Sequence, residues 1–508
     1  MRFNVFIYIL PGLSDPIKPS PAIMPSSKLR RFNFLSATLF GILGLARAAT
    51  SAECCALVSQ LSANMVFMPN TFTYATEQAD FWSSTEQLSP SCVFFPDTPE
   101  KVAEAVSLFV QNDCKWSIKG GGHSAIPGAA NIHHGILMPM ERLKRFDISD
   151  DKKTVVVGAG NLMGDIYEGL DPHNLTAMIG RYQQVGLGVA VGAGFSYLVN
   201  ENGLAVDNVI NYEVVLANAT IVNANATDNP DLFRALKGGS NNFGVVTAFT
   251  FLTVSTEGSV YGGILYYNES YLDRVSDVIY DYHVRFNPIA YNKAVNAFPE
   301  IFQGWLDIPT YGNTVHNRQY YDLSVELENG FPNGLVQEQR VFTVYADAQL
   351  YKDLWAHFHV WCQGYQHIPG FYGLHVNMPI TARAVHEGIN KGGNILGLEG
   401  AGNRTLGTIY FGVSFNNLED IEEVLPAHDE FVKSMIALAE SRGLLHRYIV
   451  DTGDYSYSML TYSGFDQPVI ESYGPENMQK IVAVQDAYDP DRVFQRLVPG
   501  GQKIPVPT

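Results

Sequence analysis

Apolar and polar positions alternate in short blocks from residue 92 onward, and the first blocks predict a strand, a helix and a second strand. Cys92–Phe95 is an apolar run, and Thr98 followed by Pro99 is typical of a helix start. Apolar residues then recur at the spacing of a packed helix face, at Val102, Val106, Phe109 and Val110. Lys115–Lys119 is the second strand. Because a βαβ unit places a turn at the carboxyl end of a strand, the turn that opens at Gly120 is a candidate binding turn.

The pattern continues with short elements as far as residue 254. It predicts a strand over Thr154–Val157, a helix over Asn161–Leu170, a hairpin of Val214–Leu216 with Thr220–Val222, a helix from Pro230 to Gly238, and strands over Phe243–Val246 and Phe249–Val254. Beyond residue 258, glycine tracts give way to aromatic, half-alternating strands. Here the predicted elements are a helix whose face carries Leu272, Val275, Ile279 and Tyr282, a strand over Val341–Tyr345, and helices over Glu430–Arg442 and Glu476–Ala487.

The change in texture near residues 255–262 predicts two main domains, in keeping with a chain of 508 residues. The predicted divisions are a leader over 1–48 with an upstream extension over 1–23, an N-terminal segment of the first domain over 49–87, the first domain over 88–258, a substrate domain over 259–474, and a C-terminal segment over 475–508 that returns to the first domain.

The N-terminus has the pattern of an export signal. Lys28, Arg30 and Arg31 precede the apolar run Phe32–Leu45, and a small-x-small cleavage site follows at residues 46–48. This signal begins at Met24, which we therefore take as the true start. The run is short for a membrane span, so we expect a secreted protein with no membrane attachment after cleavage. The formal net charge of −18 disfavours a nucleic-acid partner.

Because disulfides form in the secretory pathway, the five cysteines of a secreted chain are candidates for disulfide bonds. Four of them (Cys54, Cys55, Cys92 and Cys114) cluster within about sixty residues, which predicts one or two disulfides. We favour a bond from Cys54 or Cys55 to Cys114, although the sequence leaves the connectivity open. Five N-x-[ST] sequons predict glycosylation sites at Asn174, Asn218, Asn225, Asn268 and Asn403.

Three common chemistries find little support. The dinucleotide-binding fingerprint G-x-G-x-x-G needs a third glycine. Met163 stands at that position after Gly158 and Gly160, and Val191 after Gly186 and Gly188, which disfavours a dinucleotide-binding fold without eliminating it. Neither Ser124 nor Ser463 lies in a G-x-S-x-G elbow. The adjacent pair His133–His134 would point to opposite sides of a strand, and no cysteine pair has metal-ligand spacing, so we predict no metal site.

An ordered series of motifs resembles the flavin-binding domain of vanillyl-alcohol oxidase and its berberine-bridge-enzyme relatives, particularly the secreted fungal oxidoreductases. The resemblance covers nearly the whole mature chain, most weakly between residues 260 and 450. Its motifs are the loops Lys119-Gly120-Gly121-Gly122-His123-Ser124 and Pro127-Gly128-Ala129-Ala130-Asn131-Ile132, the stretches 206–209, 211–215, 229–233 and 237–244, and the C-terminal stretches 472–474 and 488–494.

The resemblance implies an α+β fold: a two-subdomain PCMH-type FAD-binding domain plus a substrate domain with an antiparallel sheet covered by helices. It implies FAD bonded covalently through His123. The implied cofactor-binding residues are Lys119, Gly120, Gly121, Gly122, His123, Ser124, Ala129, Gly186, Gly188, Gly192, Asp207 and Val246. Relatives with a second bond carry a cysteine where this chain has Tyr182, so we expect a single covalent link.

The resemblance also implies oxidation of a small organic substrate, which we expect to be a secondary-metabolite alcohol or a related intermediate. A base removes a proton, flavin receives hydride, and molecular oxygen reoxidises it to give hydrogen peroxide. Many relatives carry a Y-x-N-Y motif where this chain has residues 459–462, so the base is not transferred from the family, and Tyr455, Tyr457 and Tyr462 are candidates by proximity. Two alternatives stay open: a carbohydrate oxidase, and a non-redox binding or cyclisation scaffold that retains flavin.

Overall fold

A computed structural model describes residues 5–8, 49–285, 302–328, 332–450 and 453–505. The predicted leader over residues 1–48 lies outside the described residues, apart from the strand β1 (Val5–Tyr8), which pairs in parallel with β12 (Val260–Tyr267). None of the helices in the described ranges combines the length and the apolar character that a membrane crossing needs.

The predicted strand–helix–strand unit is confirmed and lies in a four-stranded sheet of order β2-β3-β5-β4. Its helix α3 begins at Pro99, is capped by the Thr98 side chain, and buries three of the four predicted apolar positions, while Val110 is half-buried. Strand β4 begins at Trp116, one residue later than expected, and lies parallel to β5. The elements here are α1 (Ser51–Leu61), β2 (Val66–Phe67), α2 (Phe72–Ala79), β3 (Cys92–Phe94), α3 (Pro99–Gln111), β4 (Trp116–Lys119) and β5 (Ile136–Pro139).

A six-stranded sheet follows, with order β10-β9-β11-β7-β6 and β8 paired to β11. The predicted hairpin is confirmed, since β9 and β10 pair in antiparallel fashion and Ala219 adopts a positive φ in the turn. The two strands predicted after Phe243 form one long strand, β11, which pairs with β9 on both sides of a register irregularity between Val246 and Ala248. The elements are β6 (Phe146–Ile148), β7 (Thr154–Gly158), α4 (Met163–Leu170), β8 (Leu175–Ala177), α5 (Val199–Asn202), β9 (Val209–Val215), β10 (Ile221–Asn225), α6 (Pro230–Leu236) and β11 (Val245–Ser255).

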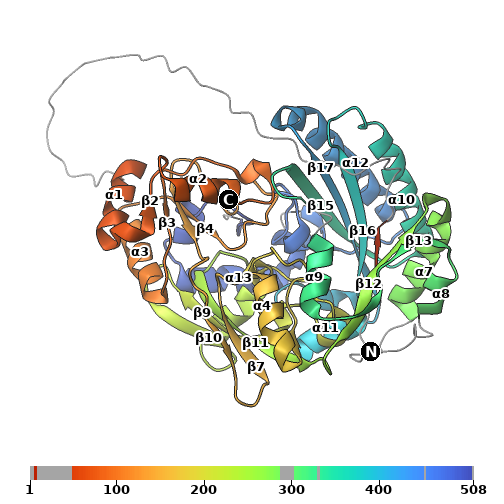
Figure 1. Ribbon diagram of the computed structural model, residues 1–508, viewed down its shortest axis with the longest axis horizontal. Coiled ribbons are helices and arrows are strands. Elements are labelled where there is room, and N and C mark those ends of the chain that lie inside the picture. The colour runs from red at the N-terminus through yellow and green to blue at the C-terminus, as the bar shows by residue number, and fades with distance from the viewer. Residues whose placement is uncertain (1–4, 9–48, 286–301, 329–331, 451–452, 506–508) are drawn as a thin grey trace.

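The expected antiparallel sheet of the second half is present as β15-β17-β16. Helices α10 and α12 pack on one face of it, and α7 packs against α10 (Figure 1). Phe411 of the sheet contacts Phe358 of α10 and Phe431 of α12, and Phe342 packs against Phe411. The elements are α7 (Leu272–Arg285), α8 (Gln303–Leu306), β13 (Thr310–Asn313), β14 (His316–Arg318), α9 (Tyr320–Glu328), β15 (Val336–Tyr345), α10 (Ala348–Gln363), β16 (Tyr372–Ile380), α11 (Ala382–Asn390), β17 (Leu406–Phe415), α12 (Ile421–Ser441), β18 (Arg447–Val450) and β19 (Gly453–Ser456).

The last helices return to the first half of the chain. Helix α13 (Pro475–Tyr488) contacts α6, and Phe494 of α14 (Val493–Arg496) packs against Trp116 of β4. Among the predicted helices, α12 departs furthest from its expected bounds: it begins at Ile421 rather than Glu430 and contains Pro426. The proline obscured the first turns in the sequence, whereas Val424 and His428 on either side of it are buried in the packed helix. The predicted domain limits stay a prediction.

Two disulfides join the N-terminal helix to the first sheet. Cys54 bonds Cys114, and Cys55 bonds Cys92, so α1 is tied to β3 and to the residues just before β4. The favoured bond to Cys114 is confirmed and Cys54 is its partner, while Cys362 is a buried free cysteine.

The five sequons differ in exposure. The asparagines Asn174, Asn218, Asn268 and Asn403 are exposed, whereas Asn225 is half-buried and donates its amide N–H groups to Asn211 and Asp228. Because glycosylation needs that amide nitrogen free, Asn225 is the least suitable of the five. Use of any of these sites stays a prediction.

Candidate active site

The glycine turn after β4 lies against a second glycine segment, backbone to backbone. A Cβ atom on Gly121 would collide with the main chain at Gln184 and Gly186, and one on Gly186 would collide with Gly121. Gly122 adopts a φ of +66°, which favours glycine. Within the described ranges, the N–H groups of Gly121, Gly122 and His123 have no hydrogen-bond acceptor. Successive unpaired N–H groups of this kind form a concave site suited to an anion such as a diphosphate.

We name the space beside this turn the glycine-loop cavity. It has a volume of ≈ 260 Å³ and lies between the turn, the segment that leads into the 3₁₀ helix Leu187–Val191, and strand β11. Nine of the predicted cofactor-binding residues line it: Gly120, Gly121, Gly122, His123, Ser124, Ala129, Gly186, Gly188 and Val246. Tertiary folding thus brings together residues up to 126 positions apart in the sequence (246 − 120).

Three predicted cofactor residues do not line the glycine-loop cavity. The Lys119 ammonium lies 2.9 Å from the Glu77 carboxylate, and both side chains are buried, so the lysine neutralises a core carboxylate. Asp207 accepts a hydrogen bond from Asn394 and lines a different cavity. A Cβ on Gly192 would lie 3.0 Å from side-chain atoms of Leu460 and Thr461, so this glycine allows the segment around residue 461 to approach.

A second space, the aromatic cavity, adjoins the first. It has a volume of ≈ 230 Å³, and its walls include Trp82, Tyr182, Phe195, Tyr410 and Tyr462. The two cavities share a wall made of His123, Val185, Val189, Gln339 and Thr461. A group held in the glycine-loop cavity would therefore lie next to a molecule bound among the aromatic rings.

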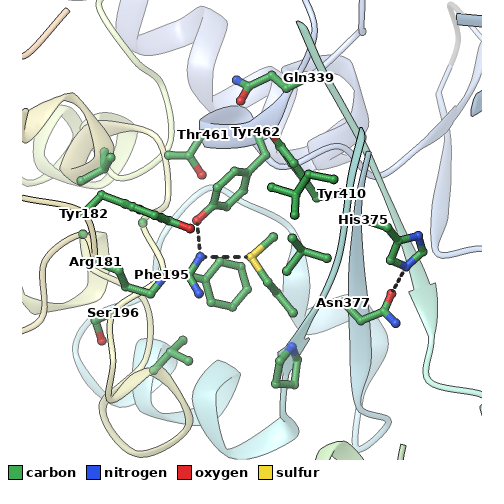
Figure 2. A pocket seen from close by; sticks show the side chains of 18 of the residues that line it. Arg181, Tyr182, Phe195, Ser196, Gln339, His375, Asn377, Tyr410, Thr461 and Tyr462 are labelled. Atoms are coloured by element: carbon green, nitrogen blue, oxygen red, sulfur yellow. Dashed lines mark hydrogen bonds between the residues drawn. The ribbon is translucent and has the colours of Figure 1, made fainter. Parts of the chain in front are cut away.

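The polar centre of the aromatic cavity is a contact between Arg181 and Tyr462. The guanidinium donates to the phenol oxygen at 3.1 Å and also lies 3.3 Å from the sulfur of Met378, as Figure 2 shows. Burial acts to lower the pKa of Arg181, but the phenols of Tyr462 and Tyr182 outweigh it, so that the pKa is raised and the side chain is cationic. Figure 2 shows the hydroxyl of Tyr182 turned toward the same place.

The three tyrosines predicted as candidate bases have different surroundings. Tyr462 lines the aromatic cavity. Tyr457 is fully buried between His446 and Tyr473, and burial raises its pKa well above the ordinary value, which disfavours proton abstraction. Tyr455 lies in β19 and lines neither cavity. Of the three tyrosines, Tyr462 is the one that lines either cavity, and the choice of base stays a prediction.

The sequence did not reveal Arg181, Gln339 and Tyr410 as site residues. Gln339 and Tyr410 belong to β15 and β17, where no motif distinguishes them from other strand residues. For Arg181 the sequence did contain a clue to a place near the cofactor, because it immediately precedes Tyr182, the position that departs from the family pattern.

The residues present fit FAD. Unpaired main-chain N–H groups suit the diphosphate, and the imidazole of His123 has its Nε2 buried without a hydrogen-bond partner among the described residues. The imidazole stacks on Trp82, with 4.4 Å between ring centroids. Residues 90–225 match the FAD binding domain family. The chain belongs to the family of FAD-linked oxidoreductases related to vanillyl-alcohol oxidase and berberine bridge enzyme.

Individual relatives cover most of the chain. It is 32% identical over 460 residues to the FAD-dependent monooxygenase tpcD of Cochliobolus heterostrophus, covering 84% of this chain and 87% of the relative. Among solved structures, wild-type BBE-like 1 of Physcomitrella patens matches with a TM-score of 0.69 at 20% identity, covering 91% of this chain and 100% of that one. Glucooligosaccharide oxidase of Acremonium strictum, with its 6-S-cysteinyl, 8α-N1-histidyl FAD, matches with a TM-score of 0.67 at 17% identity, covering 90% and 100%.

Proposed function

We propose that this FAD-linked oxidoreductase oxidises a small, ring-containing organic molecule, with a secondary-metabolite alcohol as the favoured substrate class. FAD would be held in the glycine-loop cavity by Gly121, Gly122 and His123, and would supply the redox chemistry: hydride acceptance from the substrate, with molecular oxygen as the final electron acceptor and hydrogen peroxide as its product. The aromatic cavity binds the substrate, because its rings offer apolar faces for stacking. The wall shared by the two cavities brings substrate and cofactor together.

The observation that carries this proposal is the Arg181–Tyr462 pair. Proton abstraction by Tyr462 from a substrate hydroxyl requires the phenol oxygen to bear negative charge beforehand. Arg181 is cationic and donates directly to that oxygen, so a fixed positive charge lies beside the group proposed to take the proton. In the same cavity the sulfur of Met378 and the ring of Phe195 lie close to the guanidinium and fix its direction.

We also propose that His123 holds FAD by a single covalent bond. His123 lies in the wall shared by both cavities, and Tyr182 stands where doubly linked relatives carry a cysteine. The Acremonium strictum enzyme, with its 8α-N1-histidyl FAD, is the analogy for the histidine bond. In His123→Ala, all flavin should be extractable after denaturation; flavin that stays attached would place the bond on another residue.

The base assignment is tested by substituting Tyr462 with phenylalanine. Loss of general-base catalysis should lower kcat by roughly 10²- to 10⁴-fold, with flavin content unchanged. Arg181→Met should show a similar loss. Tyr311→Phe, which removes the hydroxyl of an exposed tyrosine, is the matched control and should keep full activity. Rates are followed by anaerobic bleaching of the flavin with a panel of alcohols, and a Tyr462→Phe rate equal to that of the control would rule out this base.

A second candidate function is oxygen insertion, because the relative tpcD is named a monooxygenase. The two outcomes differ in the fate of oxygen. Turnover under ¹⁸O₂ gives unlabelled product and one peroxide per substrate for an oxidase, and labelled product for a monooxygenase. Including oligosaccharides in the same screen tests the carbohydrate alternative, and absence of bleaching with every substrate would favour the scaffold alternative.

We further propose that the protein matures in the secretory pathway and binds neither nucleic acid nor membrane after its leader is removed. Two disulfides and four exposed sequon asparagines support an oxidising, glycosylating compartment. N-terminal sequencing of secreted material should begin near Ala49. Retention of Met1 or Met24 on the mature protein would contradict this proposal.

A further inference from the structure

His123 faces a buried carboxylate from a distant part of the chain. Glu328 is the last residue of α9, and its Oε1 lies 3.6 Å from Nε2 of His123, within ion-pair distance. The side chains are 15% and 4% exposed, respectively. Neither of these two atoms has a hydrogen-bond partner among the described residues. The buried imidazole nitrogen and the buried carboxylate oxygen therefore face each other, and each is the other's partner at ion-pair distance.

The carboxylate is held in place from its other side. Its Oε2 accepts a hydrogen bond from the main-chain N–H of Gln184 at 3.3 Å. Gln184 belongs to the segment that touches the glycine turn at Gly121. Glu328 therefore spans the two backbone segments that form the glycine-loop cavity and presents one oxygen to the histidine between them.

One face of the imidazole is covered by an aromatic ring. Trp82 stacks on His123 with ring planes 10° apart. An indole face attracts positive charge, and a carboxylate does so more strongly. Trp82 and Glu328 thus both stabilise a positively charged imidazole, which is the form that arises when a neutral histidine gains a carbon substituent on its second nitrogen.

We propose that Glu328 is the positioning residue for covalent attachment of FAD to His123; this rests on the histidine bond proposed above. The negative charge of Glu328, 3.6 Å from Nε2, favours the tautomer that keeps its proton on Nε2 and leaves the lone pair of Nδ1 free, in the way that a carboxylate orients a metal-binding or catalytic histidine. Nδ1 then forms the bond to the 8α carbon.

Attachment of the flavin is a two-electron oxidation of the 8α-methyl group, with molecular oxygen as the oxidant. One C–H bond of the 8α-methyl group and one N–H bond of His123 break, and one N–C bond forms. The imidazole proton passes to Glu328 and from there to solvent. The two electrons and two protons released reduce one molecule of oxygen to hydrogen peroxide.

The test compares Glu328→Gln with the wild-type chain and with Glu326→Gln. Glu326 lies two residues earlier on α9 and pairs with Arg318 at 2.6 Å, so this control makes the same chemical change away from His123. Each protein is incubated with excess FAD in air, and samples are denatured at intervals. Covalent flavin is measured by in-gel fluorescence and by the mass of the peptide containing His123. Glu328→Gln should attach flavin at least 10-fold more slowly than the control, and Glu328→Asp should restore part of the rate because it keeps the charge.

The outcomes separate the two proposals. Wild-type protein without denaturation-resistant flavin, or with flavin on another residue, would refute the histidine bond itself and with it the role of Glu328. A wild-type bond at His123 with equal attachment rates in Glu328→Gln and Glu326→Gln would refute the role of Glu328 alone. If Glu328→Gln does not fold, the attachment rate of Glu328→Asp tests the proposal instead. Its carboxylate lies one methylene further from His123, so attachment should be slower than in the wild type, and a wild-type rate would overturn the proposal.

Discussion

Replacing Lys119 with methionine would remove the cation from a buried ion pair while keeping most of the volume of the side chain. Lys119 and Glu77 are 3% and 5% exposed, and their charged atoms are 2.9 Å apart. Burial raises the pKa of Glu77, and Lys119 counteracts this by its charge and hydrogen bond. The second partner of Lys119, Asp80, is 66% exposed, so solvent weakens that contact. The loss of folding stability in Lys119→Met is therefore determined mainly by the buried pair with Glu77.

Loss of one partner leaves an uncompensated buried carboxylate, which typically costs about 3–5 kcal/mol. At 2–4 °C per kcal/mol for a domain of this size, the melting temperature should fall by roughly 6–20 °C. Removing both charges in Lys119→Met/Glu77→Leu should recover stability to within about 1 kcal/mol of the wild type, because an apolar pair can replace a buried ion pair. Lys101→Met, which breaks the exposed pair with Glu104, is the control and should cost less than about 1 kcal/mol.

The assay is thermal unfolding followed by tryptophan fluorescence, with flavin content measured on the same samples. The ion-pair interpretation requires that stability and flavin content recover together in the double variant. A Lys119→Met protein with unchanged melting temperature but reduced flavin would show that this lysine holds the cofactor, as the sequence motif predicted. Failure of the double variant to recover would equally refute the interpretation.

Three further predictions concern stability and cofactor content. Burial raises the pKa of Glu86 to about 7, above the value of 4.5 expected for the unfolded chain. The folded protein thus keeps a proton that the unfolded chain releases between these pH values, so this contribution to stability should fall by on the order of 3 kcal/mol as pH rises through that window; pH-dependent melting of Glu86→Gln should be flatter than wild type, and parallel curves would contradict this. Gly121→Ala should cost about 1–3 kcal/mol and lower the flavin content, because its Cβ would collide with the main chain of residues 184–186; normal flavin content would disprove the close approach. Cys54→Ser/Cys114→Ser should lose about 2–5 kcal/mol in denaturant unfolding, because the bond closes a separation of 60 residues; an unchanged midpoint would show that the bond does not stabilise the fold.

Local signals in the sequence were sufficient for the elements around the glycine turn. The Thr98 cap, the helical apolar face and the three glycines act within a few residues of one another, and the structure has α3, β4 and the turn where they were expected. Predictions failed where tertiary packing or strand pairing overrode a local signal. Pro426 obscured the start of α12, whose first turns are fixed by burial of Val424 and His428, and pairing with β9 on both sides of the irregularity near Val246 made one strand, β11, of two expected strands.

By itself, the sequence determined the βαβ unit, the glycine turn that presents His123, and the supply of cysteines near the N-terminus, because periodicity, capping and turn chemistry are properties of short segments. Only the tertiary structure decided which groups meet. It paired Cys54 with Cys114, turned Lys119 toward Glu77, and joined Arg181 to Tyr462 across 281 residues. Those pairings depend on how sheets and loops pack, and no local pattern encodes the partner of a buried charge.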